Sequence, residues 1–179
     1  TLSQVEQAVS ESIDRIARFV GSKLRAGPKD LAVSRDGDVL ASIARDREIH
    51  VWDAKTGREI RTLSLEVGKF QSIAFSPASQ HLASGSQDGM LRLWSPLTDD
   101  KPLAHIKHGP PVACVRFSPD GQRIATLGQT GAARIWTVPN LELVSEFPAA
   151  GGSTIRDARF SPDGQSLAIG TYDGLVRLR

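Results

Sequence analysis

Three tryptophans set the plan of this chain, because they recur at one fixed interval. Trp52, Trp94 and Trp136 are separated by 42 residues in both intervals. An apolar residue stands 19 positions before each of them, and a fourth residue continues the series: Val33, Phe75, Phe117 and Phe160. A period of about 40–45 residues in strand-like units is typical of repeat architectures. The chain is therefore predicted to fold as a series of similar units.

The stretch 70–94, FQSIAFSPASQHLASGSQDGMLRLW, is the clearest copy of the unit. Its short apolar runs, separated by turn residues, predict strand, turn, strand, turn, strand. The first turn recurs as SPDG at residues 118–121 and 161–164, where proline supplies a φ of about −65° and glycine suits a positive φ. The second turn recurs as Asp88-Gly89, Thr130-Gly131 and Asp173-Gly174.

A further strand is predicted between successive units, at residues 60–65, 103–107 and 141–147. Each unit then has four strands, and the units are placed at about residues 30–65, 70–107, 112–147 and 154–179. The last unit has only three strands, because the sequence reaches Arg179 where its tryptophan is due. The predicted class is all-β over residues 28–179.

Residues 1–27 follow a different pattern. Their apolar residues recur every three or four positions, at Val5, Val9, Ile13, Ile16, Val20 and Leu24. This spacing predicts one amphipathic α-helix of about 20 residues, with Ser3 and Glu6 spaced as a capping box at its start. The apolar stripe has three interpretations. It packs against the repeats, it binds a partner or a second copy, or it ends an upstream domain.

The tryptophans stand in Val51-Trp52-Asp53, Leu93-Trp94 and Ile135-Trp136, after stretches such as LASGSQDG. In these residues the chain resembles the WD-repeat β-propeller family over residues 30–179. The resemblance implies a ring of blades, each made of four antiparallel strands, around a channel. It also implies a hydrogen-bonded tetrad of His, Ser or Thr, Asp and Trp in many blades, since polar groups in a dry interior need partners.

Carried over by position, no unit has the complete tetrad. The matching residues are Ser42, Asp46 and Trp52 in the first unit, Ser84, Asp88 and Trp94 in the second, His108, Thr126 and Trp136 in the third, and Asp173 in the fourth. Apolar packing is therefore expected to contribute most of the stability. The residues expected to provide it are Val33, Phe75, Phe117 and Phe160, with Leu40, Leu82, Ile124 and Leu167.

The incomplete fourth blade leaves the closure of the ring open. Propellers of this family usually close with about seven blades, and an open arc would expose unpaired strand edges. Three explanations stand side by side. The chain is part of a longer protein whose remainder completes the blade, two copies close a larger ring as a homo-oligomer, or a compact four-bladed form exists.

Composition narrows the functional classes. The 179 residues include 22 Lys and Arg against 20 Asp and Glu, a net charge of +2. That balance gives no field of the kind that nucleic-acid or membrane-surface binders carry. The single cysteine, Cys114, excludes an internal disulfide framework. We expect no cofactor, no metal and no catalysis, because phosphate-binding, nucleophile-elbow and Cys/His metal patterns are missing from the sequence. A cytoplasmic location is expected.

The resemblance implies that partners bind the side of the propeller that carries the second turn of each unit. Seven residues in or beside these loops are predicted to contact a partner: Arg45, Lys69, Gln71, Gln87, Gln129, Arg156 and Tyr172. Tyr172 and Arg156 are the strongest of them, since interface hot spots favour tyrosine and arginine.

The sequence thus predicts a non-catalytic scaffold that binds a protein or a peptide, and neither nucleic acid nor membrane. Two alternatives stay open. The chain is a regulatory segment of a larger signalling enzyme, such as a kinase or a nucleotide-driven switch protein, or it is a structural module that assembles with itself through the helix and the open blade edge.

Overall fold

A computed structural model shows the fold and describes residues 29–44, 47–66, 68–147, 155–171 and 176–178. This part of the chain is all-β, and its strands form three four-stranded sheets and one three-stranded sheet, all antiparallel. We call these sheets blades 1 to 4 in chain order. The helix predicted over residues 1–27 lies outside the described residues.

Each blade is a run of consecutive strands. Blade 1 has β1 (Asp30–Val33), β2 (Val39–Ile43), β3 (Glu48–Asp53) and β4 (Glu59–Ser64). Blade 2 has β5 (Phe70–Phe75), β6 (Leu82–Ser86), β7 (Met90–Trp94) and β8 (Pro102–Lys107). Blade 3 has β9 (Val112–Phe117), β10 (Arg123–Gly128), β11 (Ala133–Thr137) and β12 (Leu143–Phe147). Blade 4 has β13 (Ile155–Phe160), β14 (Leu167–Thr171) and β15 (Val176–Leu178).

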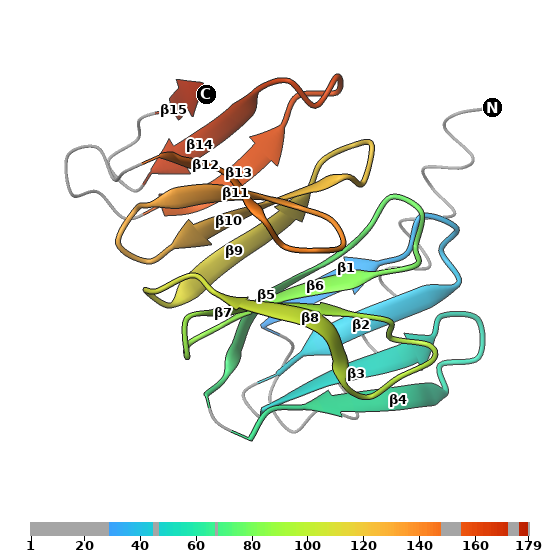
Figure 1. Ribbon diagram of the computed structural model, residues 1–179. Helices are drawn as coiled ribbons and strands as arrows, with labels where there is room; N and C mark the ends of the chain where they lie inside the picture. The colour runs from blue at the N-terminus through green and yellow to red at the C-terminus, as the bar shows by residue number, and fades with distance from the viewer. Residues whose placement is uncertain (1–28, 45–46, 67, 148–154, 172–175, 179) are drawn as a thin grey trace.

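The blades follow one another in space in the order of the chain, from blue and teal in blade 1 to red in blade 4 (Figure 1). The four-stranded sheets of blades 1 to 3 span residues 30–64, 70–107 and 112–147. One predicted strand starts too early, because residue 141 belongs to a turn. Leu141 has a φ of +58° and its amide donates to the carbonyl of Thr137, so the extended strand β12 begins only at Leu143.

Glycine occupies the left-handed position of the first turn where the sequence predicts it. Gly121 and Gly164 have φ values of +73° and +71°. In blade 2 the equivalent place is taken by Ser79, with a φ of +59°. The turn geometry is thus kept even where the sequence departs from SPDG, and a residue other than glycine takes on a conformation that L-residues rarely adopt.

Three of the four hydrophobic clusters of the described residues lie between blades, and the fourth, around Leu40 and Trp52, is formed by blade 1 alone. On β6, Leu82 packs with residues of blade 1, whereas the next residue, Ala83, packs with residues of blade 3. On β10, Ile124 and Ala125 divide in the same way between blade 2 and blade 4. This follows from the pleat, which points successive side chains to opposite faces of a sheet. β6 and β10 therefore each contribute to two cores.

The expected apolar packing is confirmed for every residue except Val33. Leu40, Leu82, Ile124 and Leu167, each near the start of its strand, are at most 2% exposed. The other set ends the first strand of each blade, and there the expectation is wrong for Val33, which is 38% exposed. Phe75, Phe117 and Phe160 are half-buried, and each packs against a hydrophobic core as expected. All four of these residues also line a groove on the surface.

Candidate functional site

Three blades contain the same buried hydrogen bond between tryptophan and a hydroxyl. The indole Nε1 donates to Ser42 Oγ from Trp52 at 2.9 Å, to Ser84 Oγ from Trp94 at 2.8 Å, and to Thr126 Oγ1 from Trp136 at 2.7 Å. The register explains the pairing. Trp94 lies opposite Leu82, and Ser84 is two residues further on the same face of β6. A register shift just before each tryptophan adjusts the outer strand to the large side chain.

The turn aspartate of blade 2 has partners other than histidine. Asp88 accepts hydrogen bonds from Ser86 Oγ at 2.5 Å and from the amide of Met90 at 3.0 Å. Its second oxygen lies 2.6 Å from Arg92 Nη2. Burial raises the pKa of Asp88, but the bonds from Arg92, Ser86 and Met90 outweigh it, so the pKa is lowered from its usual value. Asp88 therefore holds the second turn against β7.

We expect the Asp88→Asn variant to be less stable at pH 7 and to lose less stability in acid than the wild type. The unfolded-state pKa is about 3.9, and the folded-state pKa is lower. Ionised Asp88 thus stabilises the fold above pH about 4, and this contribution is lost as pH falls through the folded-state pKa. Urea unfolding at pH values from about 2.5 to 7 measures it. Glu142→Gln, an exposed carboxylate in a turn, is the control, and equal acid slopes for both variants would contradict the expectation.

His108 is buried beside Trp136, with ring centres 6.4 Å apart. Its Nδ1 lies 3.4 Å from the carbonyl oxygen of Pro110, and its buried Nε2 has no hydrogen-bond partner in the part of the chain that the structure describes. Burial lowers the pKa of His108, and the guanidinium of Arg134 lowers it further, which favours the neutral ring. Among the described residues no hydrogen bond joins His108 to Thr126. The tetrad that the resemblance implies is thus represented here by its Trp–Thr part.

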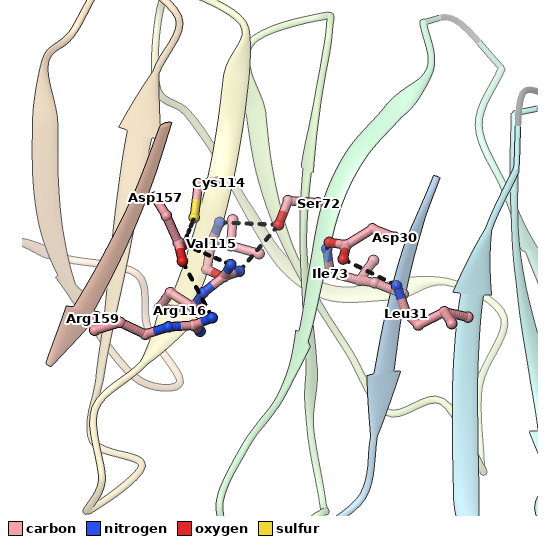
Figure 2. Close-up of polar contacts among 9 residues, drawn as sticks. All are labelled: Asp30, Leu31, Ser72, Ile73, Cys114, Val115, Arg116, Asp157 and Arg159. Carbon is pink, nitrogen blue, oxygen red and sulfur yellow. Dashed lines mark hydrogen bonds and ion pairs between the residues drawn. The ribbon is translucent and has the colours of Figure 1, made fainter. Parts of the chain in front are cut away.

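The first strands of the blades lie side by side and are linked by a chain of polar contacts (Figure 2). Asp30 Oδ2 accepts the amide hydrogen of Ile73 at 3.0 Å, and Ser72 Oγ accepts that of Val115 at 3.4 Å. Cys114 Sγ lies 3.6 Å from Asp157 Oδ1, and burial raises the pKa of this thiol to about 11. Asp30, Ser72 and Cys114 follow the 42-residue period. That period was the signal from which these contacts could have been predicted.

The predicted partner-binding residues that are described lie on one side of the blades. The amide of Gln87 donates to the carbonyl of Lys69 at 2.9 Å, which holds the second turn of blade 2 against the loop before β5. Lys69, Gln87 and Gln129 are exposed, and Gln71 is half-buried. Sequence reasoning missed Lys29, whose Nζ donates to Gln71 Oε1. The structure thus brings Lys69, Gln71 and Gln87 together at the start of β5.

The remaining predicted residues fall outside this description. Arg45, Asp46, Tyr172 and Asp173 lie outside the described residues, and Arg156 is described only as part of the backbone of β13.

Within the described ranges no group of three or more His, Cys, Asp or Glu residues could hold a metal ion. No helix long and apolar enough to cross a membrane occurs in the same ranges.

Comparison with protein families gives four matches to the model described as "WD domain, G-beta repeat", at residues 16–53, 57–95, 100–137 and 141–178. The last three matches each begin just before the fourth strand of one blade and end at the third strand of the next blade. The first match runs from residue 16 to the end of β3. The first match therefore extends into the sequence for which a helix is predicted.

Individual relatives match over shorter stretches. The chain is 34% identical over 94 residues to Protein HIR1 of Cryptococcus neoformans, which covers 52% of this chain and 10% of that protein. It is 43% identical over 61 residues to eukaryotic translation initiation factor 3 subunit I of Neurospora crassa, covering 34% of this chain and 18% of that one. A U3 snoRNP-associated protein-like protein of Arabidopsis thaliana is 37% identical over 65 residues, which are 36% of this chain and 14% of that protein. The chain thus spans only a small part of each of these relatives.

Proposed function

Because this chain belongs to the WD-repeat family, we propose that it is a non-catalytic scaffold that binds a protein or peptide partner. The binding side is the one with the second turns, and its residues are Lys69, Gln71, Gln87 and Gln129 with Lys29, joined by Arg45, Arg156 and Tyr172. We also propose a cytoplasmic location, since a lone buried thiol such as Cys114 suits a reducing compartment.

The observation that carries this proposal is that exposed loop side chains lie on blades whose first strands are joined to one another by polar contacts. The first strands are joined from blade to blade by the contacts of Asp30, Ser72 and Cys114. The second turn of blade 2 is in turn bonded to the loop before β5 through Gln87 and Lys69. Loops held by a rigid scaffold are the usual place for recognition, and preorganised side chains lose less entropy when a partner binds.

The test compares the proteins that co-purify with the wild-type chain and with the K69E/Q87A/Q129A variant. All three side chains are exposed, so we expect the variant to fold normally and to lose its partner by at least about tenfold. The matched control is K101E/T98A/E142A, which also makes one charge reversal and two truncations to alanine, at exposed positions outside the first and second turns. Quantitative mass spectrometry of the captured proteins is the measurement. Equal capture by both variants would contradict the proposed binding side.

A further inference from the structure

A groove of about 560 Å³ opens at the far end of the first strands. β5 begins beside Lys69 and ends at Phe75, so at about 3.3 Å per residue the groove is roughly 17 Å from the proposed binding side. Its walls are the ends of the first strands and the first turns of the blades. The apolar part of this lining consists of Val33, Ala74, Phe75, Pro77, Phe117, Pro119 and Phe160. The volume is in the range of about 300–1,000 Å³ that ligand sites have.

Two arginines of the groove are held in place by one carboxylate. Arg116 Nη2 lies 2.8 Å from Asp157 Oδ1, and its Nη1 donates to the carbonyl of Val115 at 2.8 Å. Arg159 Nη2 lies 3.2 Å from Asp157 Oδ2. Figure 2 shows both guanidinium groups beside Asp157, from β9 and β13. Because the Arg159 side chain is 68% exposed, it still has donors available for an incoming anion.

A third arginine, Arg35, adds to this charge from the first turn of blade 1. Its side chain is exposed and makes no ion pair with any described residue. The groove lining contains Arg35, Arg116 and Arg159 but no Asp or Glu. Asp157 pairs with two of these arginines. The carboxylates of Asp36, Asp120 and Asp163 in the first turns accept hydrogen bonds from the serines of their own turns. The lining itself therefore has an excess of positive charge around an aromatic and proline surface.

We propose that this groove binds an acidic peptide segment of a protein partner, with apolar side chains between its carboxylates. The carboxylates would bind Arg159 and Arg35, since guanidinium and carboxylate form strong paired hydrogen bonds. The apolar side chains would cover the half-buried rings of Phe75, Phe117 and Phe160. The inference rests on the proposed scaffold function and gives it a second site, at the opposite end of the first strands.

A peptide fits these features better than a nucleic acid does. Nucleic-acid binding depends on many phosphate contacts, whereas this groove offers three arginines, and Asp157 already contacts two of them. The chain as a whole has 22 basic against 20 acidic residues, so its net charge gives little long-range attraction for a polyanion. The groove can bind a short segment through a few carboxylates and apolar side chains.

The test uses the full 179-residue chain and a fluorescein-labelled peptide of three Glu-Phe-Asp-Leu repeats, followed by fluorescence anisotropy. We expect saturable binding that weakens when salt rises from about 0.05 M to about 0.3 M. The R35E/R159E variant should bind at least about tenfold more weakly. The milder R35Q/R159Q should also lose affinity, and it keeps the test valid if the charge reversal lowers stability. The matched control K101E/K107E changes the charge equally at exposed positions on and beside β8, and it should bind like the wild type.

Several results would overturn the proposal. These are equal binding of a Lys-Phe-Lys-Leu peptide, tighter binding of an oligothymidylate, unchanged affinity in R35Q/R159Q, or no binding of the acidic peptide to the wild-type chain. The last result would leave the scaffold function intact if K69E/Q87A/Q129A still loses the native partner. Conversely, peptide binding without any effect of K69E/Q87A/Q129A would contradict the first binding side and keep the groove.

Discussion

Replacing Trp94 by alanine is expected to lower the free energy of unfolding by about 3–5 kcal/mol, the usual loss for a large buried aromatic side chain. Trp94 is 1% exposed and fills the core between blades 1 and 2. Its ring meets that of Phe70 edge to face, with centroids 6.2 Å apart. The substitution leaves a cavity at this contact and removes the only indole donor to Ser84 Oγ, a hydroxyl in a fully buried residue.

The variant Trp94→Phe separates packing from hydrogen bonding. Phenylalanine keeps an aromatic ring near Phe70 but cannot donate to Ser84, so we expect a loss of about 1–3 kcal/mol, smaller than that of alanine. Urea unfolding followed by circular dichroism measures both variants, because the optical signal then does not depend on the substituted tryptophan. A loss below about 1 kcal/mol for Trp94→Ala would contradict the role assigned to this side chain.

Among the glycines in the turns of blades 1 and 2, Gly89 is expected to give the largest loss of unfolding free energy when it is replaced by alanine. Gly89 has a φ of +76°, and an added Cβ would lie 2.2 Å from the carbonyl oxygen of Gly109. The left-handed conformation costs alanine about 1–2 kcal/mol, and forcing the backbone of residue 109 aside adds about 1–3 kcal/mol. Residue 109 could relieve this contact by moving away from residue 89. That movement is opposed by the hydrogen bond that the amide of His108 donates to the carbonyl of Gly89 at 2.7 Å.

Gly37→Ala is the matched control for this prediction. Gly37 has the same φ of +76°, but an added Cβ would meet no atom within 4 Å. Its loss of stability should therefore be the conformational part alone, about 1–2 kcal/mol. The difference between the two variants in urea unfolding isolates the contact with Gly109. Equal losses would show that this contact does not constrain the turn.

Much of the fold could be predicted from the sequence because the repeat fixes which face each residue occupies. The spacing from Trp94 to Ser84 is the same as that from Trp52 to Ser42, and both pairs form the same hydrogen bond. Strand order also followed, since consecutive strands joined by short turns pair as neighbours. These features depend on local sequence and on a period that repeats within the chain.

The groove could not be predicted in the same way, because its properties depend on residues from different blades. Val33 has the same repeat position as the half-buried phenylalanines, yet it is 38% exposed. The pair of Arg116 with Asp157 joins residues 41 apart. The repeat carries an arginine at the first position only in blades 3 and 4, and an aspartate at the second only in blades 1 and 4. Departures from the repeat were the available signal. Such a departure marks a position where one blade differs from the others. Only the structure shows which residue of another blade lies in contact with it.

The location of the cores between blades has a consequence for how this chain folds and how it tolerates damage. Leu82 and Ala83 serve two different interfaces from one strand, so a single blade on its own would have two open faces and no enclosed interior. The smallest cooperative unit is then a pair of adjacent blades, and coupling passes from neighbour to neighbour as in other repeat arrays. A substitution such as Trp94→Ala should first weaken the packing of blade 1 against blade 2, while the interface of blades 3 and 4 keeps its own stability.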